Sequence, residues 1–260
     1  MLTQYSLLHS EVHAQHRSSA LCFSLSIIRS LPKKVSIPLF ILALSLIGCA
    51  RAPLPSSLNT GTARIALLTE HYGEIKDPAE IAYMNSVVRR LSSAPSHYRR
   101  SYPDTGFSVV ILKTDSPLAF SAGGGLIAVS SGLIKSLATE GELAFVLSHE
   151  IAHEYLGHCS DTDRLTDEEV SQREEVADKM GLGIMAIAGY DPRSSVPGLM
   201  RSYRALRQQR DPREVSETSY PSLTRRVSAL EQEIFNSRWQ PPGTIDKRDF
   251  QKLKLALKSR

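Results

Sequence analysis

The sequence predicts an α+β fold that is mainly helical and contains a small β-sheet. Three long stretches, at about 78–93, 140–158 and 167–189, carry apolar residues at helical spacing. Two shorter stretches, 107–112 and 126–129, are rich in β-branched and apolar residues and are bounded by Ser, Asp and Gly, as strands are. We expect the helix at 140–158 to cross the core.

Capping residues support the helix boundaries. Asp77 and Pro78 are an N-cap and a proline at the first helical position. Thr166 and Glu169 match a capping box, and Gly189 ends the helix that follows. Further helices are expected at about 192–208, 221–235 and 245–257.

The N-terminal part has the layout of a secretory signal. Lys33 and Lys34 precede an apolar run at 35–47, and Leu-Ile-Gly then leads into Cys49, which resembles the bacterial lipobox. We predict that residues 1–48 are a cleaved leader and that Cys49 carries the lipid. An uncleaved membrane helix is the alternative, but the run is short against the ~20 residues needed to span a bilayer.

The other segments follow from composition. Residues 1–31 show no fold-forming periodicity and are consistent with a misassigned start of translation. Residues 49–62 are rich in Pro, Ser, Gly and Thr, as a flexible tether is. We expect the folded domain at 63–243. A basic helix at 244–260 either packs on the domain or rests on anionic lipid.

The distribution of charge excludes a nucleic-acid partner. The formal net charge of the chain is +4. Residues 1–48 account for +3 of this, so the remainder has 27 basic and 26 acidic side chains. A nearly neutral body has no electrostatic footprint for a phosphate backbone.

An HExxH sequence, His149 to His153, lies in the middle of the predicted core helix. At ~100° per residue the two histidines are ~400° apart, so both face one side and can reach one ion. Imidazole nitrogen is a preferred zinc donor, and Glu150 is placed to act on a metal-bound water. Random placement of the histidines and glutamates would give roughly 0.015 such sequences, so chance explains it poorly.

A catalytic zinc site needs a third protein ligand and one open position. Glu174 is the best candidate, because it lies 21 positions after His153, far enough for a turn and a return pass. Asp178, one helical turn further on, is placed to accept a hydrogen bond from a ligand histidine. A solvated acidic face is the alternative for both residues.

Two nearby residues are not expected to bind the metal. His158 follows His153 by five positions, which places it on the opposite side of a continuous helix from His149. Cys159 has the spacing of a third ligand, but the helix would have to break before it. With Cys49 acylated and the leader removed, Cys159 has no disulfide partner.

In these motifs the chain resembles the gluzincin zinc peptidases that include the CAAX prenyl proteases and HtpX, and among them the lipoprotein proteases of outer-membrane assembly. The resemblance runs from about 77 to 230 and implies a zincin-type metallopeptidase domain with the small sheet above the zinc helix. Four patterns carry it: 119–133 with its glycines, the HEIAH helix, Glu174 to Asp178, and Ala188 to Pro192.

The resemblance implies further roles. The glycine strand, with Gly124, Gly125 and Leu126, would be the sheet edge that pairs with an extended peptide substrate. An ordinary turn before a core strand is the alternative. Many relatives have, at the position of Tyr220, a histidine that helps to hold the transition state or gates the zinc. The Tyr220 hydroxyl either donates to an oxyanion or only packs.

The implied activity is that of a zinc metalloendopeptidase with one Zn²⁺ held by His149, His153 and Glu174. Glu150 would be the general base. We expect the substrates to be misfolded or envelope proteins. We expect the protein on the periplasmic side of a bacterial membrane, the outer membrane rather than the inner one. A regulatory or assembly partner is also compatible with this function. The alternative is a lipid-anchored chaperone or assembly adaptor with a latent zinc site.

Overall fold

The structure is a computed structural model, and the described residues belong to one unit that runs from Asn59 to Arg260. No helix within these residues is both long enough and apolar enough to cross a membrane. Cys49 and Tyr220 lie outside the described part, so their predicted roles stay predictions. The described ranges are 61–93, 106–159, 165–209, 223–237 and 248–259.

A mixed sheet has the strand order β1-β2-β4-β3. β2 (Ser108–Leu112) and β4 (Leu126–Ser130) are parallel and interior, and they correspond to the two strands expected from the sequence. β1 (Glu74–Ile75) and β3 (Ala119–Gly123) pair antiparallel at the two edges. Neither β1 nor β3 was predicted as a strand, because a two-residue strand and an Ala-Phe-Ser-Ala-Gly run lack a β-branched pattern.

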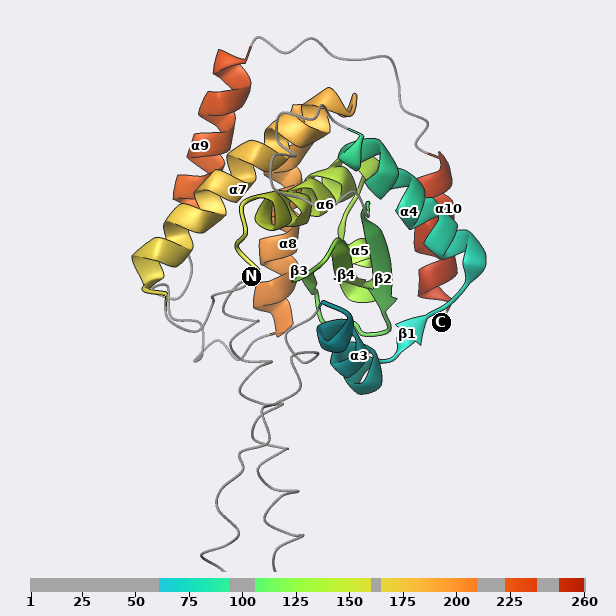
Figure 1. Cartoon of the computed structure of the whole chain (residues 1–260). Helices are drawn as coiled ribbons and strands as arrows, with labels where there is room; N and C mark the ends of the chain where they lie inside the picture. The colour runs from blue at the N-terminus through green and yellow to red at the C-terminus, as the bar shows by residue number, and fades with distance from the viewer. Residues whose placement is uncertain (1–60, 94–105, 160–164, 210–222, 238–247, 260) are drawn as a thin grey trace, which may run out of the picture. The chain divides into compact units, whose positions relative to one another are not determined.

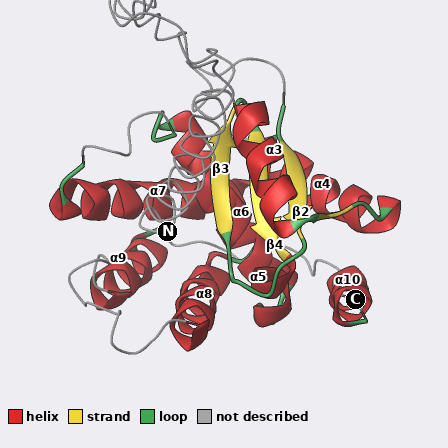
Figure 2. Cartoon of the chain, turned by 90° about the horizontal axis from the view of Figure 1, so that it is seen from below, coloured by secondary structure: helices red, strands yellow, loops and turns green. Residues whose placement is uncertain are grey.

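The two faces of the sheet have different coverings. Alternate residues of β2 and β4, starting with Val109 and Ile127, belong to the main core and therefore point to one face. α4 (Pro78–Ser92) and α6 (Glu140–Tyr155) pack on that face. α3 (Gly61–Tyr72) lies over the other face (Figure 2). This helix was not predicted, and its first two residues were expected in the tether.

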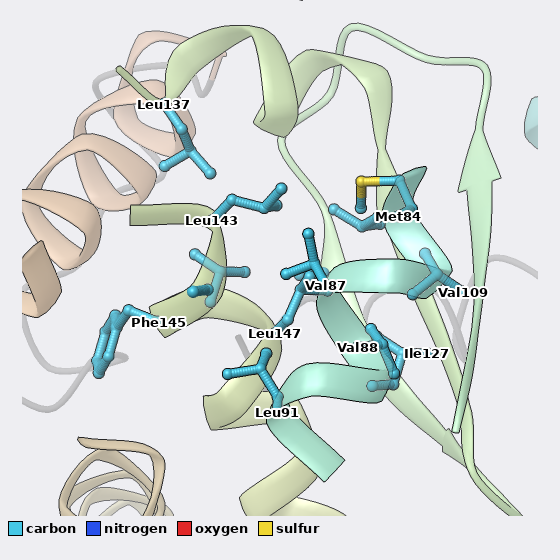
Figure 3. Packing of buried hydrophobic residues seen from close by; sticks show 14 of the residues in the cluster. Met84, Val87, Val88, Leu91, Val109, Ile127, Leu137, Leu143, Phe145 and Leu147 are labelled. Carbon is cyan, nitrogen blue, oxygen red and sulfur yellow. The ribbon is translucent and has the colours of Figure 1, made fainter. Parts of the chain in front are cut away.

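α4 supplies one side of the core. Its N-cap Asp77 accepts a hydrogen bond from the backbone N–H of Ala79 at 3.0 Å, which confirms the predicted helix start. Figure 3 shows Val87 and Leu91 of α4 beside Leu147 of α6. This apolar contact joins the two helices, and all three side chains are buried.

α6 is the central helix, and α7 (Asp167–Ile187) runs beside it. Residues 143–154 of α6 are all buried, as expected for a helix that crosses the core. α7 starts with the predicted capping box, in which Thr166 and Glu169 bond each other's backbone. α6 ends at Tyr155, before the predicted end at 158.

Other helices surround this pair. In Figure 1, α9 stands beside α7, whereas α10 lies beside α4 on the other side. α10 buries Phe250, Leu253 and Leu257, so the terminal helix packs on the domain, in agreement with the first of the two alternatives. The remaining bounds are α5 (Ser131–Ser136), the 3-10 helix η4 (Pro192–Ser194), α8 (Ser195–Gln209), α9 (Leu223–Asn236) and α10 (Arg248–Lys258).

Candidate metal centre

Two helices bring the predicted zinc donors together. His149 and His153 lie one turn apart on α6, with their Nε2 atoms 3.0 Å from each other. Glu174 reaches them from α7, with Oε2 3.5 Å from Nε2 of His149 and Oε1 3.3 Å from Nε2 of His153. All three side chains are buried. Glu174 therefore does not belong to a solvated acidic face.

The triangle of donor atoms has the size that zinc requires. Tetrahedral coordination with bonds of ~2.0–2.1 Å separates the donors by about 3.3 Å. The two Nε2 atoms are 3.0 Å apart, and the nearest carboxylate oxygens of Glu174 lie 3.3 Å (Oε1) from that of His153 and 3.5 Å (Oε2) from that of His149. Within the described residues, His149, His153 and Glu174 are the group whose donor atoms all lie within 4.8 Å of one another. Three protein donors leave a fourth position for water or substrate.

Asp178 and Arg226 support these donors from behind. Oδ1 of Asp178, one turn beyond Glu174 on α7, lies 3.0 Å from Nδ1 of His149. Arg226 of α9 donates to both carboxylate oxygens of Asp178 at 2.6 Å. Its Nη1 also lies 2.9 Å from Oε2 of Glu174. One buried guanidinium thus fixes two acidic groups, although nothing in the local sequence distinguishes it from its neighbour Arg225.

Burial and neighbouring charges act in opposite directions at these groups. Burial lowers the pKa of His149, but the neighbouring carboxylates of Asp178 and Glu174 outweigh it and raise the pKa to about 9 in the absence of metal. Burial raises the pKa of Glu174 and Asp178, yet the Arg226 guanidinium and His149 hold both below their ordinary values. The metal-free site therefore has two ionised carboxylates and a proton on His149 that a metal ion must displace.

Glu150 is the third acidic group of the site. Its Oε1 atom is buried and makes no hydrogen bond to any described residue. Burial raises the pKa of Glu150, and His149 and His153 partly oppose the rise. A buried carboxylate with a free oxygen beside a donor triangle is suited to accept a proton from water.

The close approach of α7 to α6 depends on Gly181. This residue is seven positions after Glu174 and lies on the same face of α7. A Cβ atom at Gly181 would be 3.0 Å from the backbone N and 3.1 Å from Cα of His149. Any side chain here would push apart the two helices that carry His149 and Glu174.

The sheet edge nearest α6 is β3, which corrects the predicted substrate strand. Gly124 and Gly125, with φ angles of 69° and 79°, form the turn between β3 and β4. Leu126 pairs with Ser108 on one side and Gly123 on the other, so it lies in an interior strand. Positive φ angles suit glycine and end a strand, and this is why the glycine run is a turn.

Glu154, directly after His153, joins α6 to β3. It accepts hydrogen bonds from the hydroxyl of Ser121 and, at 2.8 Å, from the backbone N–H of Gly123. Arg64 of α3 donates to the carbonyl of Ala122 at 3.1 Å. These contacts anchor the end of β3 beside the helix that carries the histidines.

His158 and Cys159 do not join the group of donor atoms, as predicted. The Cys159 thiol donates instead to the Ser121 hydroxyl at 3.2 Å. Burial raises the pKa of this thiol to about 12. Burial, with His153 next to it, lowers the pKa of His158 to about 4, so its imidazole is neutral at neutral pH.

Comparison with known proteins agrees with this geometry. Residues 78–168 match the model of peptidase family M48, from the start of α4 through the HExxH helix to the start of α7. A Vibrio cholerae protein named beta-barrel assembly-enhancing protease is 30% identical over 100 residues, which are 38% of this chain and 20% of that protein. The chain thus matches about a fifth of the length of this curated relative. M48 peptidases are zinc-dependent metallopeptidases, and residues 78–168 of the chain are similar to this family.

Proposed function

We propose that the protein is a zinc-dependent endopeptidase in which His149, His153 and Glu174 hold one Zn²⁺ and Glu150 is the general base. The observation that carries this proposal is the triangle of three buried donors beside a buried carboxylate oxygen without a hydrogen-bond partner among the described residues. A purely structural zinc site is closed by four protein ligands and has no use for such a base.

The residues divide the chemistry among them. When bound, zinc supplies a Lewis acid that polarises the scissile carbonyl and makes the attacking water more acidic. Glu150 takes the proton from that water and passes it to the leaving amine. Its raised pKa allows the carboxyl group to hold the proton between the two transfers. Asp178 keeps the His149 imidazole oriented, with its proton on Nδ1.

We infer that the substrate is an extended protein segment that pairs with the edge of β3. The support is that β3 is an edge strand of the described sheet and lies against α6. Backbone pairing of this kind accepts many sequences, as degradation of misfolded proteins requires. An envelope substrate is proposed because the relative is named for beta-barrel assembly.

Lipidation at Cys49 is part of the same proposal. A lipid on Cys49, followed by a tether to about residue 62, would hold the catalytic domain on the periplasmic side of a bacterial membrane. Fractionation of cells, with a Cys49→Ser variant as control, tests this. Wild-type protein in the membrane fraction and the variant in the soluble periplasmic fraction are expected, whereas equal membrane binding would exclude a lipid anchor on Cys49.

The test of catalysis is Glu150→Gln in the purified full chain. Casein digestion should fall by about 10²- to 10⁴-fold, the usual contribution of general acid–base catalysis, while metal analysis still finds one zinc per chain. Glu168→Gln, an exposed carboxylate on α7, is the matched control and should digest casein normally. Undiminished cleavage by Glu150→Gln would contradict the assigned base. A wild type that never cleaves but suppresses aggregation would favour the adaptor.

A further inference from the structure

His158 lies just beyond the end of α6 and contacts a proposed metal ligand. Its Nδ1 atom is 3.0 Å from Nδ1 of His153. The expectation that His158 lies on the far side of the helix was wrong, because it assumed that α6 continues to residue 158. The helix ends at Tyr155, and the chain then reverses its direction.

The reversal is a Schellman motif, the common C-terminal cap of a helix. Gly157 has a φ angle of 68°, and its N–H donates to the carbonyl of Glu154 at 3.0 Å. The N–H of His158 donates to the carbonyl of His153 at 2.9 Å. These are the two hydrogen bonds that define the motif. The cap therefore places the backbone of His158 next to His153, whose imidazole the His158 ring contacts.

The hydrogen bond between the two imidazoles has a defined direction when metal is bound. His153 faces His149 and Glu174 through Nε2, so Nε2 is the atom available to zinc. A neutral imidazole that binds metal through Nε2 carries its proton on Nδ1 and is a donor there. Nδ1 of His158 must then be the acceptor, which leaves the proton of His158 on Nε2.

We propose that His158 is a positioning residue that accepts a hydrogen bond from Nδ1 of His153 and so fixes the orientation and tautomer of this zinc ligand. The inference rests on the metal site of the proposed function. It gives the two ligand histidines matching support, since Nδ1 of His149 lies 3.0 Å from Oδ1 of Asp178. Metal-bound histidines nearly always have such an acceptor on the second nitrogen.

A role for His158 as a further ligand does not fit. Its contact is with the Nδ1 side of the His153 ring, the side away from the donor triangle. Among the described residues, the group of close donor atoms contains His149, His153 and Glu174 but not His158. The residue therefore acts on the metal site through His153.

Two substitutions of similar shape test the hydrogen bond in the purified full chain. In His158→Asn, Oδ1 is attached to Cγ as Nδ1 is in histidine, so an acceptor remains at the same bond distance. In His158→Leu, a methyl group occupies that position and cannot accept. The zinc Kd, measured by competition with a chromophoric chelator, should rise about 10- to 100-fold for His158→Leu. It should stay within about threefold of wild type for His158→Asn.

A second readout separates positioning from a general loss of structure. Urea unfolding of the metal-free variants reports on packing, and the absorption spectrum of bound Co²⁺ reports on ligand geometry. His158→Leu should change the cobalt spectrum, and His158→Asn should preserve it. This difference should appear even if both variants lower the free energy of unfolding by a similar small amount. His71→Leu, an exposed histidine on α3, is the control and should alter neither the zinc Kd nor the spectrum.

The outcomes distinguish this inference from the proposed function. If wild type binds zinc and digests casein, and His158→Leu binds zinc as tightly as wild type with the same cobalt spectrum, the role of His158 is overturned and the protease proposal stands. Equal weakening by Leu and Asn would also overturn it, because the acceptor would then not matter. If wild type binds no zinc, both the proposed function and this inference fail.

Discussion

Gly181→Ala tests whether the separation of α6 and α7 sets the metal site. The new Cβ would lie 3.0 Å from the backbone N and 3.1 Å from Cα of His149, whereas ordinary contacts begin at 3.4 Å. The helices must therefore separate by a few tenths of an ångström. Overpacking of this kind costs about 1–3 kcal/mol, and the better helix propensity of alanine returns about 1 kcal/mol. The net loss of stability should be at most about 2 kcal/mol.

Gly181→Ala should weaken zinc binding strongly even though the helices move by only a few tenths of an ångström. Zinc sites tolerate deviations of only ~0.2 Å in ligand distance, so a displacement of His149 relative to Glu174 exceeds the tolerance. We expect zinc binding at least about tenfold weaker, which corresponds to about 1.4 kcal/mol. The measurements are chelator competition for the zinc Kd and urea unfolding of the metal-free protein.

Gly198→Ala is the matched control. Gly198 lies on α8, and a Cβ there would be 3.2 Å from the carbonyl oxygen and 3.3 Å from Cα of Glu142, near the start of α6. This variant should lose similar stability and keep the zinc Kd of wild type. If Gly181→Ala binds zinc as tightly as Gly198→Ala, then the spacing of α6 and α7 does not control the site, and the reasoning is refuted.

Three further predictions follow from the buried charges. Arg226→Met should destabilise the protein by about 3–5 kcal/mol in urea unfolding, because it leaves Glu174 and Asp178 buried without their cation, and Arg226→Lys should lose less. Because metal-free His149 has a pKa of about 9, zinc binding at pH 7 should release about one proton, and zinc affinity should rise with pH up to about 9 and then level off. Titration calorimetry in buffers of different ionisation enthalpy measures this release, and a count of zero would contradict a protonated His149. Tyr190→Phe removes a 2.8 Å hydrogen bond to buried Glu140 and should lower the free energy of unfolding by about 1.5–3 kcal/mol. The zinc Kd should stay unchanged, which checks that the effect is remote from the metal.

The local sequence determined the helices that carry the site, α4, α6 and α7, and the two histidines of the site. An HExxH spacing puts both imidazoles on one helical face whatever surrounds the helix, because 3.6 residues per turn is a local property. Capping signals at Asp77 and Thr166 placed the starts of α4 and α7 correctly for the same reason. The edge strands were missed, since short strands with little β-branched character depend on their neighbours for stability.

Tertiary structure alone decided how the three proposed metal donors are brought together and supported. The contribution of Arg226 depends on where α9 packs against α7, which no local pattern reveals. The sequence predicted a helix that continues to residue 158, and only the folded helix end shows that Gly157 directs His158 back to His153. The sequence thus determined which side chains share a helix face, whereas the packing between helices decided which of these faces meet, because contacts between distant segments depend on the whole core.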